Sequence, residues 1–278
     1  MSDAVQTPRF QIVQVVLYGL VGLWSVFVLM PVAWMVFAAF KSRREIFTDP
    51  LGLPAQWTFD SFERAWGVGL GRFMFNSVVV TTASVLLIIL VSGLAAYVIA
   101  RSRNWWLKLL YLLIVAGFAV PNTAVIVPLY QMISGAGALN SHLAIVLVYS
   151  AYGIPFTTIL FFAFFLDFPR ELEEAARLDG CRPWAVFVRV VMPLSGPAVA
   201  SAAIFQSVFI WNEFLLALLM LTQPDMKTLP VGILQLQGEF TSDWPAVMAG
   251  LSIATLPIIL LFLLLQRYFV RSLAGLGK

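Results

Sequence analysis

Charged residues are scarce in this chain. Asp, Glu, Lys and Arg together make up 11% of its 278 residues, whereas hydrophobic residues make up 61%. Soluble proteins of ordinary composition carry about 25% charged residues, and a single soluble core could not bury this much apolar surface. With a mean hydropathy of +0.92, the composition excludes soluble enzymes, disordered regulators and secreted disulfide scaffolds. It predicts an all-α polytopic membrane protein.

The residues on which many catalytic and metal sites depend are also few. With one cysteine, Cys181, and one histidine, His142, the chain forms no internal disulfide and offers no His/Cys pattern for a metal. The phosphate-binding pattern Gly-x-x-x-x-Gly-Lys-Ser/Thr is absent, because the single Gly-Lys pair is at positions 277 and 278. We therefore predict that the chain is not an enzyme, and that a partner or an ion gradient supplies its energy. A net charge of +3 is too small to indicate nucleic acid.

Long uncharged runs, by contrast, are abundant. A helix needs about 20 apolar residues to cross the hydrocarbon core of a membrane. A polar, glycine-containing segment at 134–142 divides one very long run into two. The runs predict six transmembrane helices, at residues 11–40, 73–100, two within 109–166, 197–221 and 244–266.

Six spans place both termini on the same side of the membrane. Short loops rich in Lys and Arg remain in the cytoplasm, and an inside N-terminus places eleven of the 17 basic residues there and six outside. The cluster Lys41-Ser-Arg-Arg44 is a counter-signal, because it would then be external. The balance predicts that both termini are cytoplasmic.

The predicted cytoplasmic loop at residues 167–197 carries the most specific pattern. Pro169 suits the first position of a helix, and Gly180 suits a stop in the left-handed conformation. Pro183 then begins a second helix, which Pro193 ends. A short helix with a small-residue face ahead of a glycine has the shape of a knob that fits a groove in another protein. The alternative is a surface helix that lies among the lipid headgroups.

The string Glu174-Ala-Ala-Arg-Leu-Asp-Gly180, followed by Val190-Val-Met-Pro193, resembles the EAA loop of ABC-importer permeases. In that family the pattern is Glu-Ala-Ala, three residues, Gly, nine residues, Ile, any residue and Leu-Pro. The spacing matches throughout, with Val190 in place of Ile and Met192 in place of Leu. The segments 41–47, 211–217 and 266–271 are similar to carbohydrate-importer permeases, close to the maltose-type second permease subunit.

This resemblance implies a type I ABC importer permease fold in a prokaryotic inner membrane. Residues 1–71 would hold the N-terminal cytoplasmic end, the first transmembrane helix and an external loop. Residues 72–267 would form the permease core with the EAA loop at 167–197, and residues 268–278 a cytoplasmic tail. The chain would form half of the translocation pathway for a sugar and couple it to a separate ATPase through the EAA helix.

Two other functions remain as alternatives. Within the family, the substrate could be glycerol phosphate or another polyol. More distantly, the chain could be an ion-coupled secondary transporter, although such proteins usually show internal repeats and buried titratable groups. That function would also leave the EAA spacing unexplained.

The resemblance also implies a role for each residue of the EAA loop. Glu174 would be the polar anchor at the ATPase surface, and Ala175 and Ala176 would be the close-packing face. Asp179 would stabilise the loop, and Gly180 would supply its elbow. The expected coupling residues are Glu174, Ala175, Ala176, Asp179, Gly180 and Pro193.

The implied partners are a second permease subunit that is a different chain, two ABC ATPase subunits and an extracytoplasmic solute-binding protein. Membrane lipid is a further partner, and nucleic acid is not one. ATP and Mg would be bound by the partner ATPase, so that this chain would hold no cofactor.

The candidates for the substrate pathway are Trp211, Asn212, Glu213, Tyr152 and Asn76. Glu213 is the one carboxylate within the predicted spans, and a carboxylate at the bilayer centre costs about 2.5–3.5 kcal/mol. It therefore faces the pathway, or pairs with a polar or basic group on a neighbouring helix or subunit. Asn76 has the same two interpretations. The rings of Tyr152 and Trp211 either contact a sugar or pack as ordinary membrane aromatics.

Overall fold

The computed structural model describes the backbone of residues 8–238 and 242–275, and the side chains of residues 13–238 and 242–266. The predicted cytoplasmic tail, residues 268–278, therefore lies outside the described side chains. The regular elements of the described residues are helical, apart from one isolated bridge between Gln237 and Ser242. The chain divides into two compact units, residues 1–68 with 235–253 and residues 69–234 with 254–278.

Within the described part of the chain, four unbroken helices are long and apolar enough to cross a membrane: α1 (Pro8–Ala38), α4 (Leu70–Arg101), α7 (His142–Asp167) and α14 (Trp244–Gly275). Two further candidates are bent pairs of helices. α5 (Trp105–Phe118) meets η1 (Asn122–Val125) and α6 (Ile126–Gly135) at 90°, and the segment Pro183–Leu194 meets α11 (Gly196–Trp211) at 74°. Counting each pair as one span gives up to six spans, which agrees with the predicted number.

The predicted fifth span, at 197–221, is wrong as a continuous helix. α11 ends at Trp211, and α12 (Leu215–Met220) is a separate short helix. The reason is the carboxylate of Glu213, which accepts the backbone N–H groups of Leu216 and Ala217 at 2.8 Å and 3.1 Å. Because these N–H groups are unpaired at the start of any helix, a side chain that binds them favours a new helix start.

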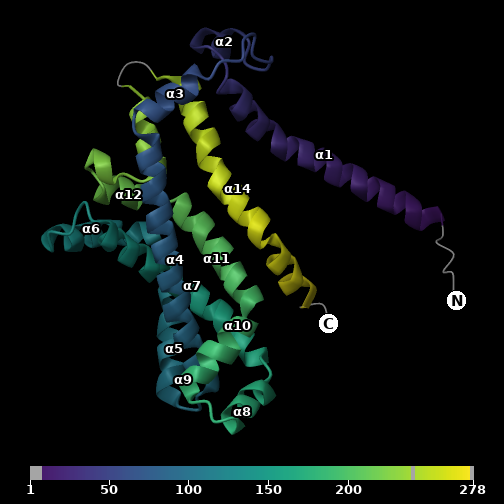
Figure 1. Cartoon of the computed structure of the whole chain (residues 1–278), viewed down its shortest axis with the longest axis vertical. Helices are drawn as coiled ribbons and strands as arrows, with labels where there is room; N and C mark the ends of the chain where they lie inside the picture. The colour runs from purple at the N-terminus through teal and green to yellow at the C-terminus, as the bar shows by residue number, and fades with distance from the viewer. Residues whose placement is uncertain (1–7, 239–241, 276–278) are drawn as a thin grey trace. The chain divides into compact units, whose positions relative to one another are not determined.

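The larger unit is built on α4, which packs along α7, with α11 against both (Figure 1). Side chains of α4, α7, α11 and α12 form one apolar cluster around Ile88 and Ile145. A second cluster, around Phe161 and Phe165, includes the far end of α4 and the loop that follows α7. Buried alanines such as Ala96 and Ala202 let these helix backbones approach closely, as small residues do in membrane bundles.

The second helix of the predicted loop does not end at Pro193. It runs as α9 (Pro183–Val186), the π-helical segment η2 (Phe187–Val191) and α10 (Met192–Leu194), and the bend follows at Ser195. Pro193 has no N–H to donate and would clash with a carbonyl in a regular α-helix. The wider π-helical turn directly before it, in which the Met192 N–H donates to the Phe187 carbonyl, accommodates the ring.

The smaller unit contains two short helices, α2 (Arg43–Thr48) and α3 (Asp60–Gly67). Ser42 and Glu45 form a capping box at the start of α2. The backbone N–H of Ala55 donates to the Glu45 carboxylate at 2.6 Å, and this bond, with that from Ser42, lowers the pKa of Glu45.

An ion pair connects α3 to the chain just before α14. The Arg64 guanidinium lies 2.6 Å from the Asp243 carboxylate. Burial acts to raise the pKa of Asp243, but the bonds from Arg64 and from the Ala246 N–H outweigh burial and lower it. Since both side chains are partly exposed, this pair contributes less than about 1 kcal/mol.

The close contact between α13 (Leu229–Ile233) and α4 leads to a prediction about packing. A Cβ atom at Gly232 would lie 2.1 Å from Cδ2 of the buried Phe73 ring. We expect Gly232→Ala to destabilise the protein by about 1–3 kcal/mol, as overpacking does, and to lower its melting temperature in detergent. Gly135→Ala is the control, because a Cβ there meets nothing within 4 Å. A Gly232→Ala variant as stable as wild type would contradict this packing.

Candidate functional site

The helix of the predicted coupling loop is α8 (Arg170–Leu178), which follows α7 and precedes α9 in the chain and lies at one end of the larger unit (Figure 1). Pro169 is the N-cap residue and not, as predicted, the first residue of the helix, because the helix begins one residue later, at Arg170. Glu171 and Glu173 are in the first turn, where the positive end of the helix dipole favours acidic residues.

The predicted helix stop at Gly180 is confirmed. Gly180 has φ of +84°, in the left-handed region that a side chain disfavours. The Cys181 N–H donates to the Ala176 carbonyl and the Gly180 N–H to the Arg177 carbonyl, both at 3.0 Å. These two bonds form a Schellman motif. Asp179 is the C-cap residue, and its backbone N–H donates to the Ala175 carbonyl.

The side chains of α8 divide into an exposed face and an inward face. The exposed residues of α8 are Arg170, Glu171, Leu172, Glu174, Ala175, Arg177 and Leu178. Four of them, Glu171, Glu174, Ala175 and Leu178, recur at helical spacing and share one face, called here the docking face. Leu178 is 89% exposed, which is unusual for a large apolar residue beside a packed core. Glu173 and Ala176 are buried on the inward face.

This division corrects the prediction that Ala175 and Ala176 share one close-packing face. Ala175 is exposed, whereas Ala176 belongs to the apolar cluster that also contains Val186 and Phe187. The cause is the neighbouring Glu173, whose carboxylate binds groups of α4 and turns this side of the helix inward.

Glu173 is a site residue that sequence reasoning overlooked. Its side chain is 4% exposed, and one carboxylate oxygen lies 2.6 Å from Nη2 of Arg101. Its other oxygen accepts the Tyr97 hydroxyl at 2.8 Å. Arg101 is 72 positions away in the sequence, so no local spacing pattern indicates the pair. The one sequence signal for the pair is that Arg101, a basic residue, directly follows the second apolar run.

Two of the predicted pathway residues have their polar groups bound within the protein. Asn76 is buried on α4, and its side-chain amide donates to the carbonyls of Asp225 and Lys227, both at 2.9 Å. Trp211 is also buried, and its indole N–H donates to the Ala254 carbonyl at 3.0 Å. These contacts favour a structural role for both residues.

Glu213 lies at the break between α11 and α12, next to Asn212. Besides the two backbone N–H groups at the start of α12, its carboxylate accepts the Tyr149 hydroxyl at 2.5 Å. Asn212 is exposed and its amide donates to the Val208 carbonyl of its own helix at 2.7 Å. The arrangement favours the second interpretation of Glu213, in which a neighbouring polar group pairs with it.

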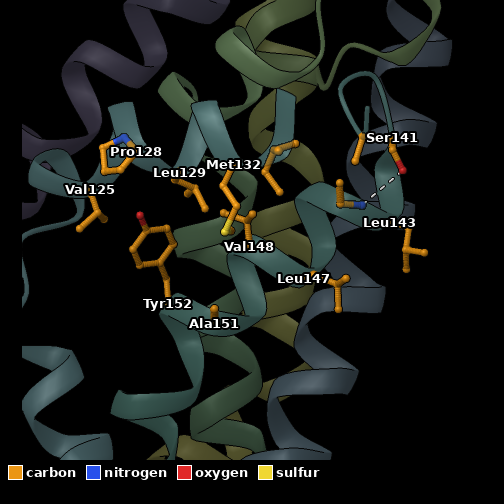
Figure 2. A pocket seen from close by; sticks show the side chains of 13 residues that line it. Val125, Pro128, Leu129, Met132, Ser141, Leu143, Leu147, Val148, Ala151 and Tyr152 are labelled. Carbon is orange, nitrogen blue, oxygen red and sulfur yellow. Dashed lines mark hydrogen bonds between the residues drawn. The ribbon is translucent and has the colours of Figure 1, made fainter. Parts of the chain in front are cut away.

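Tyr152 differs from the other candidates, because its hydroxyl has no hydrogen-bond partner among the described residues. The ring lies on the wall of two cavities. The first, of about 730 Å³, is an apolar groove between α6 and α7, where Tyr152 extends from α7 toward Val125 and Pro128 (Figure 2).

The second cavity, of about 500 Å³, combines polar side chains with aromatic rings. Its polar side chains are Tyr152, Asn122 and Gln206. The Gln206 amide is fixed by the Gly153 carbonyl and the Thr157 hydroxyl, at 3.1 Å and 2.9 Å. Phe118, Phe156 and Phe205 contribute rings to the wall, and the last two stack with centroids 4.3 Å apart. Such a mixture is typical of small-molecule sites.

Comparison with known proteins decides the family. Residues 88–275 match the family described as "Binding-protein-dependent transport system inner membrane component". The chain belongs to this family. It is therefore a membrane transport subunit without catalytic chemistry of its own, and an inner-membrane component.

Individual relatives agree with this assignment. The chain is 37% identical to the probable ABC transporter permease protein YurM of Bacillus subtilis, over 91% of this chain and 84% of YurM. It is 32% identical to the diacetylchitobiose uptake system permease protein NgcG of Streptomyces coelicolor, over 92% and 86% of the two chains.

A solved structure shares the fold. The chain superposes with a TM-score of 0.83 on a chain of a bacterial ABC transporter involved in the import of the acidic polysaccharide alginate. The match is 20% identical and covers 95% of this chain and 98% of the other. The type I ABC importer permease fold implied by the EAA loop is thereby confirmed.

Among the described residues, no group of three or more His, Cys, Asp or Glu could hold a metal ion.

The contacts of Glu213 predict how it responds to substitution. Glu213→Ala leaves the Tyr149 hydroxyl and two N–H groups without this partner, and a buried group left unpaired costs about 1–3 kcal/mol. We expect this variant to melt at a lower temperature, and Glu213→Gln, which keeps an acceptor oxygen, to transport near the wild-type rate. The measurements are melting temperature in detergent and uptake per assembled complex. If Glu213→Gln keeps the wild-type melting temperature but loses uptake, its charge serves the pathway instead.

Proposed function

We propose that this chain is a permease subunit of a binding-protein-dependent ABC importer for a sugar, coupled to a separate ATPase through α8. The exposed docking face of α8, held out on the Gly180 turn, is the observation that carries this proposal. A solvent-exposed face that presents two carboxylates and a leucine at the end of an apolar bundle is complementary to a groove on another protein. Glu174 would be its polar anchor and Leu178 its apolar anchor.

The distribution of charge supports a cytoplasmic position for α8, and with it cytoplasmic termini. Residues 101–108 and 170–189 together contain seven Lys and Arg residues. Trp105, Trp106 and Trp184 in these segments are exposed, and tryptophan is enriched where a membrane meets water. The positive-inside rule favours a cytoplasmic position for these two segments. The cytoplasm also contains the ATP and Mg that an ATPase uses.

The expected assembly contains two permease subunits, two ATPases and an extracytoplasmic solute-binding protein. The family description supports the binding protein, and a second solved importer, similar to this chain with a TM-score of 0.69, is in complex with an alginate-bound periplasmic protein. This chain would form half of the pathway. The second permease would form the other half and would be a different chain, as in the maltose-type systems that the sequence resembles.

A sugar is the proposed substrate because relatives named for a saccharide substrate include NgcG and the alginate importer. The cavity beside Tyr152, Asn122 and Gln206 supports this class, since hydroxyl and amide groups can bond to sugar hydroxyls while rings cover apolar sugar faces. Glycerol phosphate or another polyol is the alternative within the same family.

The coupling role of α8 predicts the behaviour of two substitutions. Glu174→Lys reverses the charge of the docking face, and loss of an interface anchor costs about 2 kcal/mol or more, roughly thirtyfold in affinity. Gly180→Pro cannot adopt a φ of +84° and removes the N–H that binds the Arg177 carbonyl. We expect both variants to insert normally, to lose the copurifying ATPase and to lose uptake.

The control is Asp167→Lys, which reverses an exposed charge at the end of α7, outside α8. Uptake is measured with a panel of labelled disaccharides that includes diacetylchitobiose, and with labelled glycerol 3-phosphate for the polyol alternative. Full uptake and ATPase recovery by both α8 variants would contradict the coupling role. Uptake that follows an ion gradient and ignores ATP would contradict the importer itself.

A further inference from the structure

We propose that Glu173, Arg101 and Tyr97 form a latch that fixes α8 rigidly to α4 and α7, so that movement of the docking face is transmitted into the membrane. The inference rests on the proposed coupling function of α8. It assigns the transmission to Glu173, which is buried on the inward face opposite the docking face, and to Tyr97 and Arg101 of α4, which bind it.

Little apolar burial holds α8 in place. Of its nine residues, two are buried, Glu173 and Ala176. A single alanine methyl group contributes little apolar burial. Because α8 otherwise contacts α9 and η2, its attachment to α4 depends on Glu173. A carboxylate that is 4% exposed must also have strong partners, because an unpaired buried charge is very unfavourable.

One guanidinium group, that of Arg101, joins three elements. Arg101 is the last residue of α4, and its Nε donates to the Glu173 carboxylate on α8 at 2.8 Å. Its Nη1 donates to the Phe165 carbonyl at 2.6 Å and its Nη2 to the Phe168 carbonyl at 3.3 Å. These carbonyls belong to the end of α7, where the last carbonyls of a helix have no partner within it.

Tyr97 completes the latch from the preceding turn of α4. Its hydroxyl donates to the second oxygen of Glu173 at 2.8 Å, so that both oxygens of the carboxylate are bound from α4. Its ring packs against Phe165 of α7 and Phe187 of η2, with centroids 5.9 Å and 5.0 Å apart. Bonds in several directions to one carboxylate restrict both the position and the rotation of α8.

The geometry specifies arginine at position 101. Its planar fork reaches the carboxylate and the α7 carbonyls at the same time, whereas the single ammonium group of lysine cannot span both. Conformational coupling requires elements that move as rigid bodies. The latch makes α8 and the ends of α4 and α7 one such body.

The experiment uses the full chain in complex with the ATPase that copurifies with it. Spin labels are attached to the native Cys181, just after α8, and to Val98→Cys on the exposed side of α4. The distance distribution between the labels reports how firmly α8 is held. Sugar uptake and ATP hydrolysis are measured on the same complexes without labels, using the sugar of the panel that wild type transports best.

We expect Glu173→Gln and Arg101→Lys to broaden the distance distribution and to lower the sugar transported per ATP hydrolysed by about tenfold, within the usual range of coupling between sites. ATPase binding should persist, because the docking face is unchanged. Asp167→Asn and Arg103→Lys are matched controls at exposed positions, and both should behave as wild type. Tyr97→Phe keeps the ring contacts and should give a smaller change in the same direction.

Unchanged distances and unchanged transport per ATP in Glu173→Gln and Arg101→Lys would overturn the latch. Failure of these variants to bind the ATPase would also overturn it, because Glu173 would then only support folding of the loop. If the Glu173→Gln and Arg101→Lys variants do not fold, Tyr97→Phe is the deciding test, and a wild-type distance distribution in that variant counts against the latch. If wild type itself recovers no ATPase, the proposed function fails, while the distances in the isolated chain still test the latch.

Discussion

The pairing of buried charge dominates the architecture of this chain, because lipid and an apolar core offer no water to a carboxylate. The two acidic side chains that enter the larger unit most deeply solve this problem in different ways. Glu173 binds Arg101 and Tyr97 and thereby determines which side of α8 turns inward. Glu213 binds Tyr149 and the start of α12, and thereby divides the predicted fifth span into two helices. In both places a carboxylate, more than apolar packing, sets the course of the backbone.

Gly180 and the latch have complementary effects on the same short helix. The left-handed turn at Gly180 ends α8 so that Leu178 remains exposed, while Glu173 binds the opposite side to α4 and α7. A helix held on one side and exposed on the other is suited to receive force from a partner and pass it on. The π-helical segment η2 continues this body toward the bend before α11.

Much of the fold was accessible from the sequence, because span length and hydropathy directly reflect the thickness of the membrane. The six apolar runs, the helix stop at Gly180 and the family of the loop were all predictable, since each depends on residues close together in the chain. The bends before Asn122 and at Ser195 were not predictable, because hydropathy does not report whether an apolar run forms one straight helix. The pair of Arg101 and Glu173 was not predictable either, since 72 positions separate its partners.

The docking face of α8 is proposed to bind an ATPase, and Leu178 is the position at which this contact can be tested most directly. A photo-crosslinking amino acid is placed at position 178, which is 89% exposed, and in parallel at Leu166 of α7, which is 54% exposed. After irradiation of native membranes, mass spectrometry identifies what is attached to each position. We expect an ABC ATPase to be attached at position 178 and none at position 166. Attachment of lipid alone at position 178 would contradict the proposed contact, because α8 would then lie among the headgroups and not in a partner's groove.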